Sequence, residues 1–424
     1  MKKAILILII LFIGLVPCKR SFGAGFALYE FSSRGNALGG AMIGRADDPS
    51  ALAYNPAGIT QLEESQWLFG FTAIMPSTVG IFQDSGISYE LEDMLFLVPH
   101  FYYSAPLNDE LWWGLGTFSR FGLGTEFDEN WEGRYNSYLA GIKSVSVNPS
   151  LAWKLTDQLS FAAGLELMWF QLELKKKVDP TGGLAPDTFT DIDARIKGDD
   201  IGWGWNLGMH FQPAEKVKLG LSYRSTVDLE VEGNARFYKP EILELPDNFF
   251  PDTGAGGEVT LPEMYMAGVC YDFSNRTSIE FDVVRTMWSS YDNLTIAFDD
   301  PLNPLDPTSN IQSSEKNWKD TWRYQVGLEH KLKNDWTIRL GYIFDESPIP
   351  DETVDFIAPT SDRNLYSIGT EYKKGDWTFD LSYIYIDMDN RFVSAEGREG
   401  EGLADAVFTD SRTHLVGLTL NYRF

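Results

Sequence analysis

The side chains that could do chemistry in this sequence are few and lie far apart. Neither a Gly-x-Ser-x-Gly motif nor a phosphate-binding loop occurs. Glu280 and Asp282 share one face of a predicted strand, where charged residues suit the lining of a channel. The histidines show no spacing typical of metal ligands; they are His100, His210, His330 and His414. We therefore expect no catalytic residue, no metal site and no cofactor.

A basic cluster is better suited to binding than to catalysis. Lys175, Lys176 and Lys177 end a long alternating stretch that begins near residue 159. A carboxylate that enters an apolar pocket needs a cationic partner, because an unpaired buried charge is costly. The cluster could therefore hold an acidic headgroup. A solvated basic patch at an interface explains the same residues equally well.

The first residues predict export. A basic start, an apolar run at residues 4–16 and small residues before Ala24 form the pattern of a secretory signal peptide. We expect residues 1–23 to be removed. A lipoprotein is disfavoured because Pro17, not a small residue, precedes Cys18. Cys270 is then the one cysteine left, so the exported chain cannot form an internal disulfide.

The charge of the chain excludes one class of partner. Its formal net charge of −26 would repel the phosphates of nucleic acid. The acids gather in Pro- and Asp-containing stretches such as 247–252 and 299–301. We expect these stretches to be solvated loops, and binding of cations by them is the alternative.

From residue 65 onward, apolar and polar residues alternate as they do along strands. A soluble sandwich would alternate too. Here, however, the polar face carries full charges and glycines, as the lumen of a membrane barrel does. Apolar stretches begin or end in aromatic residues such as Trp336 and Trp377, and the chain ends on Phe424. These features predict an all-β membrane protein, since bilayer-crossing helices would need about 20 consecutive apolar residues.

The alternating stretches predict a closed antiparallel transmembrane β-barrel of about 14 strands. Short turns follow every even strand and longer polar loops follow every odd one, which places the short turns and both barrel ends on the periplasmic side. The sheet must close because lipid offers no partner for a free edge. The predicted strands are roughly 65–75, 96–105, 112–127, 143–155, 159–175, 200–211, 217–232, 257–272, 277–288, 318–331, 336–345, 364–372, 377–388 and 413–424.

Residues 24–64 do not alternate and precede the predicted barrel, residues 65–424. Asp47-Asp48-Pro49-Ser50 reads as the start of a helix. A barrel of this size has a lumen too wide for its own side chains to fill. We therefore expect residues 24–64 to form a small N-terminal hatch that plugs the lumen.

Short motifs spread over nearly the whole exported chain resemble those of long-chain fatty-acid outer-membrane transporters of the FadL type, a family that includes importers of aromatic hydrocarbons. The resemblance implies a fourteen-stranded barrel with an N-terminal plug, located in the Gram-negative outer membrane. It also implies a hydrophobic small-molecule ligand and contact with outer-membrane lipid. The motifs are AGFALYEFSS (24–33), ADD (46–48), NPA (55–57), SRFGLGTEF (119–127), LPEM (261–264), 318–323, GYIFDESPIP (341–350) and DR (362–363).

The resemblance also implies a passive, ligand-gated route. The ligand would leave sideways through an inward kink of the third strand, and the plug would contact that kink. Glycines inside a strand mark a bend, which agrees with a kink here, although they could merely let the barrel curve. The implied gate residues are Asn55, Pro56, Ala57, Ser119, Arg120, Phe121, Gly122, Leu123 and Gly124.

The resemblance implies ligand-binding roles for Phe26 and for two basic residues. Phe26 corresponds to an aromatic residue that the plug inserts into the inner pocket. Lys176 stands where the family has a basic headgroup contact, with Lys in place of Arg. Lys cannot form the forked contact of Arg, so headgroup preference could differ. Lys316 or Lys319 would supply the second contact.

Several alternatives stay open. An importer of monoaromatic hydrocarbons would have a similar apolar lining. A general porin for polar solutes would need no hatch, and a surface receptor or adhesin would act through its acidic loops. An outer-membrane hydrolase is the weakest alternative, because no catalytic constellation is present. The sequence does not give the oligomeric state; the monomeric habit of the family is an expectation.

Overall fold

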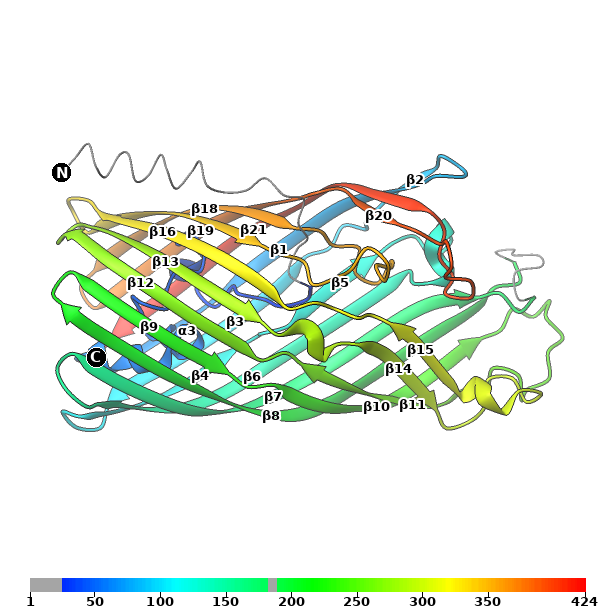
Figure 1. Cartoon of the computed structure of the whole chain (residues 1–424), viewed down its shortest axis with the longest axis horizontal. Helices are drawn as coiled ribbons and strands as arrows, with labels where there is room; N and C mark the ends of the chain where they lie inside the picture. The colour runs from blue at the N-terminus through cyan, green and yellow to red at the C-terminus, as the bar shows by residue number, and fades with distance from the viewer. Residues whose placement is uncertain (1–24, 182–188) are drawn as a thin grey trace.

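The chain folds into the predicted closed barrel. The computed structural model describes residues 25–181 and 189–424, so the expected signal peptide (1–23) and Ala24 lie outside the described residues. Fourteen antiparallel strands form the wall, and three of them are interrupted (Figure 1). None of the described helices is long and apolar enough to cross a membrane.

Each uninterrupted wall strand overlaps one predicted strand. They are β1 (Gln66–Phe82), β3 (Phe96–Pro106), β6 (Leu139–Lys154), β7 (Leu159–Val178), β8 (Ile192–Ala214), β13 (Thr277–Thr286), β16 (Thr321–Lys331), β17 (Trp336–Asp345), β18 (Arg363–Lys374), β19 (Trp377–Met388) and β21 (Ala406–Arg423). The interrupted strands are β4 (Leu111–Phe118) with β5 (Gly122–Glu126), β9 (Val217–Arg224) with β10 (Val227–Tyr238), and β11 (Thr253–Leu261) with β12 (Met264–Ser274).

Short strands and turns of 3-10 helix extend the wall at the end with the long loops. The strands are β2 (Ser88–Glu90), β14 (Asn293–Phe298), β15 (Ile311–Glu315) and β20 (Arg391–Val393). The 3-10 turns are η2 (Glu132–Tyr135), η3 (Trp288–Ser290) and η4 (Pro307–Asn310).

The first and last strands close the sheet. β1 pairs with β21 from Gln66↔Arg423 to Phe82↔Ala406, with one irregularity between Ser77 and Val79. This seam removes the free edges that a bilayer would not tolerate, because each unpaired backbone group in lipid costs several kcal/mol. The seam is as long as the strands themselves, so it is a full part of the wall.

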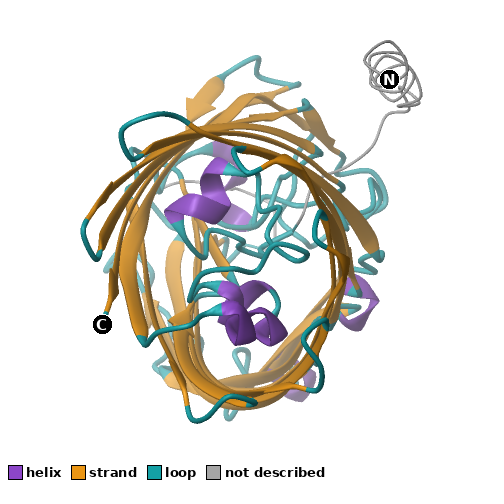
Figure 2. Ribbon diagram, turned by 90° about the vertical axis from the view of Figure 1, so that its left-hand side faces the viewer, coloured by secondary structure: helices purple, strands orange, loops and turns teal. Residues whose placement is uncertain are grey.

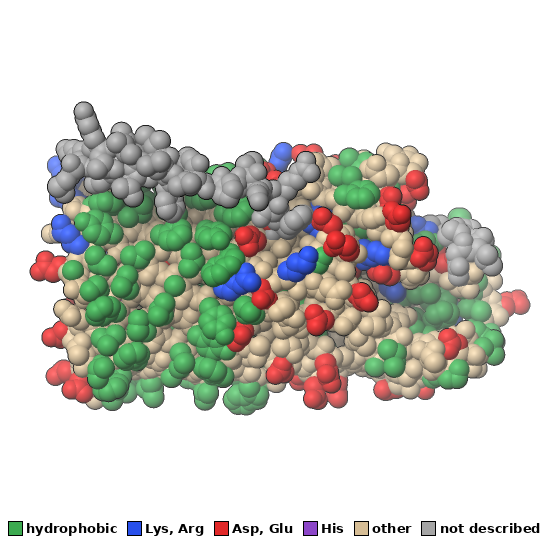
Figure 3. All heavy atoms as spheres, viewed as in Figure 1, with side chains coloured by type: hydrophobic (Ala, Val, Ile, Leu, Met, Phe, Trp, Pro, Cys, Tyr) green, Lys and Arg blue, Asp and Glu red, His purple; other side chains and the backbone are tan. Residues whose placement is uncertain are grey.

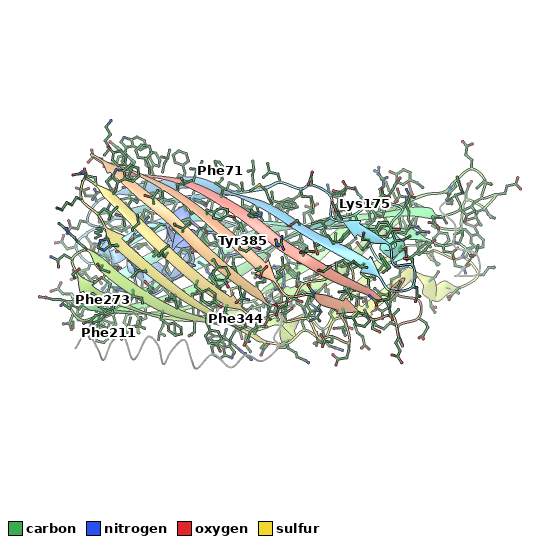
Figure 4. All side chains as sticks on the ribbon, turned by 90° about the horizontal axis from the view of Figure 1, so that it is seen from above. Phe71, Lys175, Phe211, Phe273, Phe344 and Tyr385 are labelled. Atoms are coloured by element: carbon green, nitrogen blue, oxygen red, sulfur yellow. The ribbon has the colours of Figure 1, made fainter. Side chains whose placement is uncertain are left out.

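Apolar side chains cover the outside of the barrel over the half that carries the short turns (Figure 3). On the visible face, acidic side chains lie at the two ends and over the half with the long loops. Aromatic residues mark both limits of this apolar belt, as they do in membrane barrels. Figure 4 labels Phe211 and Phe273 near the short-turn end and Phe71, Tyr385 and Phe344 further along the barrel.

Several predicted strands were too short at the end with the long loops. β8 begins at Ile192 rather than 200, and β21 begins at Ala406 rather than 413. Above the belt, the outward side chains of β8 are charged (Arg195, Lys197 and Asp199), and those of β21 include the exposed Asp410 and Arg412. The apolar-polar alternation therefore disappears from the sequence although the backbone ladder continues. The strands predicted at 217–232 and 257–272 are each interrupted, at residues 225–226 and 262–263.

Residues 25–64 lie inside the barrel and carry both described α-helices and one turn of 3-10 helix (Figure 2). The helices are α2 (Ser33–Ala37), α3 (Ala51–Tyr54) and η1 (Pro56–Gln61). The helix predicted to start at 47–50 begins at Ala51, and Ser50 occupies its N-cap position. α2 packs against β17, β18, β19 and β21, while η1 packs against β4, β6, β7 and β8. The segment therefore spans the lumen from wall to wall, and we call it the hatch.

Buried acids of the wall hold the hatch by its backbone. The Asp282 carboxylate accepts hydrogen bonds from Met42 N at 2.9 Å and Ile43 N at 3.0 Å. The Glu280 carboxylate accepts them from Gly44 N at 2.7 Å and Arg45 N at 3.0 Å. Both acids face the lumen, as predicted, but they are fully buried against the hatch and do not line an open channel.

We predict that removing this pair of acids loosens the hatch and leaves the barrel closed. In Glu280→Ala/Asp282→Ala, four backbone donors lose their acceptors, at a cost of about 1–3 kcal/mol each where they stay buried. Single-channel conductance in planar bilayers should rise clearly above that of the native protein. The matched control is Glu230→Ala/Glu232→Ala, which removes two exposed acids from β10. Equal conductance in the two variants would contradict the anchoring role.

Candidate functional site

The wall has a gap where the third strand is interrupted. β4 pairs with both of its neighbours, β3 and β6. β5 pairs with β6 alone among the described strands, from Gly122↔Lys143 to Glu126↔Leu139. The pairing of β3 with β4 ends at Phe101↔Thr117, so residues 96–100 of β3 pair only with β1. The backbone ladder is therefore open between residues 96–100 and β5.

A cavity of about 620 Å³ occupies this gap. Its lining includes Ser144 and Thr413, which face the lumen, and Leu95 and Leu97, which are 61% and 60% exposed on the outside. The cavity thus crosses the wall, and we call it the lateral chamber. Most of its lining is apolar. Gly122 and Gly124 border it, and a Cβ on Gly124 would lie 2.0 Å from the ring of Phe96.

The N-terminal end of the hatch is bonded to the interruption itself. Gly122 N donates to Phe26 O at 2.9 Å, and Leu28 N donates to Arg120 O at 2.7 Å. Ala27 and Phe121 form the antiparallel bridge between these two bonds. Residues 26–28 therefore replace, over a short stretch, the strand partner that residues 120–122 lack in the wall. We call this pairing the hatch latch.

Phe26 fills an aromatic box on the other side of the latch. Its ring centroid lies 4.7 Å from that of Trp288, 5.5 Å from Trp318 and 5.8 Å from Tyr291. Phe26 is only 4% exposed. The space left beside it is about 30 Å³, room for about one water molecule. While Phe26 occupies the inner pocket, no room for a larger molecule is left there.

The inner pocket has one cationic side chain. Lys316 is 3% exposed, lines the pocket and forms an ion pair with the equally buried Asp355. Thr353 also lines it and donates its hydroxyl to Lys316 O. Lys319 is exposed and does not line the pocket. Of the two residues that sequence resemblance offered for a second basic contact, the structure brings Lys316 to the pocket.

A second groove of about 380 Å³ adjoins the inner pocket on the side of the long loops. Leu174, Leu294, Asp355 and Ile357 line both. Lys176 lines the groove, since it alternates with Leu172 and Leu174 on the inner face of β7. Lys175 and Lys177 have the opposite parity and pair with Glu173 and Glu129. The basic cluster therefore divides between the two faces of the strand.

The structure corrects the position implied for Asn55. Its side-chain amide donates to Ile43 O at 2.9 Å and to Met209 O at 3.0 Å, so it ties the hatch to β8 and not to residues 119–124. Its Oδ1 accepts from Ala57 N at 3.3 Å and caps η1, which begins at Pro56. The interrupted strand is instead contacted by residues 26–28.

The residues implied for the kink do lie at the interruption. Ser119, Arg120 and Phe121 are buried between the ends of β4 and β5, and Leu123 of β5 pairs with Ile142 of β6. Arg120 extends into the lumen, where its Nη1 lies 3.0 Å from the Glu166 carboxylate. Arg224 Nη1 binds the same carboxylate at 3.2 Å and donates through Nη2 to Leu52 O at 2.7 Å. The interruption is thus linked to the hatch at a second place.

Sequence reasoning missed several of these residues. Glu166 and Arg224 are single charges on lumenal faces and share no motif. Trp288 ended a predicted strand and gave no sign of a pocket. Asp355 was one acid among many in an acidic loop region. Within residues 25–181 and 189–424, no group of three or more His, Cys or acidic side chains is placed to hold a metal ion.

Comparison with known proteins agrees with the barrel fold. The family described as "Outer membrane protein transport protein (OMPP1/FadL/TodX)" matches residues 15–424. A "Long-chain fatty acid transport protein" of Escherichia coli is 27% identical over 441 residues, which cover 96% of this chain and 95% of that protein. "Outer membrane protein P1" of Haemophilus influenzae is 24% identical over 459 residues, covering 95% of each.

Two solved structures share the fold. A FadL homologue of Pseudomonas aeruginosa has a TM-score of 0.84 at 20% sequence identity, covering 95% of this chain and 100% of that one. The toluene transporter TodX of P. putida has a TM-score of 0.73 at 19% identity, covering 95% of this chain and 99% of that one. Both likenesses extend over the whole barrel.

We predict that the buried Lys316–Asp355 pair responds strongly to loss of one partner and weakly to loss of both. Lys316→Met leaves a buried carboxylate unpaired and should lower the free energy of unfolding by about 3–5 kcal/mol. Lys316→Met/Asp355→Leu should recover most of this loss. Urea unfolding in detergent micelles measures both. The exposed Arg412–Asp410 pair is the control, and Arg412→Met should cost at most about 1 kcal/mol. Equal losses in the single and double variants would contradict the pairing.

Proposed function

Because this chain belongs to the OMPP1/FadL/TodX family of outer membrane transport proteins, we propose that it takes up long-chain fatty acids by passive, ligand-gated diffusion and releases them sideways into the membrane. Its family transports hydrophobic small molecules and is not an enzyme family. Membership confirms the predicted family and the outer-membrane location. The specific ligand, the gating and the exit route are our proposals.

The proposal is carried by the position of the hatch latch between two cavities. Phe26 faces the inner pocket, while Gly25, Ala27 and Leu28 line the lateral chamber. These four consecutive residues form part of the partition between the pocket with the buried lysine and the chamber that opens through the wall. Displacing them would join the two spaces. One movement would thus both admit a ligand and open its way out.

The lysines are placed for a carboxylate that travels inward. Lys176 in the second groove would meet the headgroup first, and the lining residues that this groove shares with the inner pocket lead from there to Lys316. A fatty-acid carboxylate carries the same group as the Asp355 side chain, so it can take over the ion pair that Asp355 makes with Lys316. The charge on Lys316 then stays paired. The displaced Asp355 carboxylate must turn toward the second groove, which it also lines, because a carboxylate left unpaired in the pocket would be costly.

The energies permit a ligand to displace Phe26 without another energy source. Fully burying a Phe side chain is worth about 1.5–3 kcal/mol, and each buried methylene about 0.8 kcal/mol. A chain of roughly ten methylenes would therefore gain about 8 kcal/mol, well above the loss from expelling Phe26. A short ligand would bury too few methylenes to offset the loss from expelling Phe26, so the latch favours long alkyl chains.

An importer of monoaromatic hydrocarbons is the second candidate. The aromatic box of Trp288, Trp318 and Tyr291 would suit a benzene ring, which needs no cationic partner. The buried Lys316 favours the fatty acid, because a neutral ligand gains nothing from it. A general porin is disfavoured by the hatch, which crosses the lumen. We propose that the barrel acts as a monomer.

We predict that one double substitution distinguishes a fatty-acid transporter from an importer of aromatic hydrocarbons. Lys316→Met/Asp355→Leu keeps the pocket packed and removes its charge. Oleate uptake by cells that carry the variant should fall by about tenfold or more, as expected for loss of about 1.4 kcal/mol or more of binding. Toluene uptake should not change. A fall in toluene uptake with oleate uptake intact would instead support the aromatic-hydrocarbon alternative.

We also predict that filling the wall gap blocks exit. In Gly124→Val the new side chain meets the Phe96 ring and occupies the lateral chamber. A barrier raised by about 1.4 kcal/mol would slow passage about tenfold. Gly141→Val is the matched control, because Gly141 lies opposite Gly124 on β6 and a Cβ there has no neighbour closer than 3.9 Å. Both variants should keep heat-modifiable mobility, which reports barrel assembly. Equal uptake in both would refute lateral exit at this gap.

A further inference from the structure

A basic groove lies on the outside of the barrel, beyond the edge of the apolar belt. Along β8, the outward side chains are Trp205, Trp203 and Ile201, and then charged ones. Asp199, Lys197 and Arg195 follow at alternate positions, all exposed. The apolar face thus changes to a charged face within two residues. The same change occurs on β7, where Trp169 is followed outward by Gln171, Glu173 and Lys175.

The strand register brings three cations into one row. Lys175 on β7 lies directly opposite Arg195 on β8, and Arg195 lies opposite Arg236 on β10. Lys197 is two residues from Arg195 on the same face. Like charges directly opposite each other destabilise a sheet. Such a row is unexpected in a chain whose net charge is −26. Figure 4 labels Lys175, which lies beyond the labelled belt aromatics toward the long loops.

Neighbouring acids neutralise this row only in part. Arg195 binds Asp193 at 2.7 Å, but Lys175 and Lys197 share Glu173 at the longer distances of 3.4 and 3.9 Å. Arg236 makes no ion pair with any residue of the described ranges. An excess of positive charge therefore remains on the outer surface.

The row lines a groove of about 430 Å³. Its charged lining comprises four cations and two carboxylates: Lys175, Arg195, Lys197 and Arg236, with Glu173 and Asp199. Tyr238 borders it, and the guanidinium carbon of Arg195 lies 4.8 Å from the centroid of the Tyr238 ring. This groove adjoins the second groove, because Lys175 and Ile196 line both. Its other three cations, Arg195, Lys197 and Arg236, line this groove alone, while Lys176 lines only the second groove.

We propose that this groove binds the phosphorylated headgroup of a lipid in the outer leaflet. A lipid whose chains lie along Trp169, Ile201 and Trp203 would bring its headgroup to the level where the cations begin. Guanidinium groups bind phosphate through paired hydrogen bonds, and Lys175 and Lys197 add point charges. The lipid phosphate supplies negative charge that Asp193 and Glu173 provide to the row only in part. This site would hold the barrel at a fixed depth beside its lipid neighbours.

The charges select this occupant over others. A soluble protein would have no reason to dock at the margin of the belt, where lipid headgroups already crowd the surface. Free phosphate would gain the charge contacts but not the adjacent apolar surface, so it should bind much more weakly. Each cation near an anionic lipid surface strengthens binding, so loss of three should weaken retention by about tenfold or more.

Native mass spectrometry of the purified full-length barrel tests the proposal. The protein is incubated in detergent with diphosphorylated lipid A or with its enzymatically dephosphorylated form, and bound lipid is counted per barrel. The native protein should retain the phosphorylated form at least tenfold more strongly. Lys175→Gln/Arg195→Gln/Arg236→Gln should lose this preference. The matched control is Lys216→Gln/Lys333→Gln/Lys374→Gln, which removes three exposed cations from short turns at the other end and should retain it.

Each other outcome overturns the proposal. Equal retention of both lipid forms, or an unchanged preference in the groove variant, would show that these cations do not bind the lipid phosphate. Competition by inorganic phosphate at millimolar concentration would show a site for the free ion and not for a lipid. If the groove variant does not assemble, as judged by heat-modifiable mobility, Arg236→Gln alone replaces it. That variant removes the cation that pairs with no acid of residues 25–181 and 189–424, and it should weaken retention severalfold.

Discussion

The structure depends on one constraint, which is that backbone groups inside a bilayer must find hydrogen-bond partners within the protein. The long seam between β1 and β21 meets this constraint around the barrel. At the interruption of the third strand, the wall does not meet it, and residues 26–28 of the hatch supply two of the missing bonds. The hatch is therefore a partner of the wall as well as a plug. The place where it can leave is the place where the wall can open.

Buried charges decide which parts of the hatch stay and which can move. Glu329 on β16 is bound by Arg34 at 3.3 Å, Arg45 at 3.1 Å and Arg339 at 2.7 Å. The two hatch arginines, Arg34 and Arg45, cannot leave Glu329 without leaving buried charges uncompensated, which costs several kcal/mol. By contrast, the latch at residues 26–28 contributes two backbone hydrogen bonds and one displaceable Phe side chain. The hatch thus has a fixed body and a movable tip.

Much of the fold could be predicted from the sequence, because period-2 alternation records which face of each strand meets lipid. The prediction failed where that contrast ends, as at residues 192–199 of β8, where charged side chains face outward above the belt. The candidate site was harder to predict than the fold. Gly122 and Gly124 marked the interruption, but Asn55 was assigned to it wrongly and holds β8. Glu166 and Asp355 act through partners distant in the sequence, which a single sequence does not reveal.

Locking the hatch latch tests the central claim most directly. Ala27 and Phe121 face each other as a non-hydrogen-bonded antiparallel pair, whose Cα atoms are typically about 4.5 Å apart and within reach of a disulfide. In Ala27→Cys/Phe121→Cys, oleate uptake should be lost when the pair is oxidised and should return on reduction, with the barrel assembled in both states. Undiminished uptake by the oxidised protein would contradict the account.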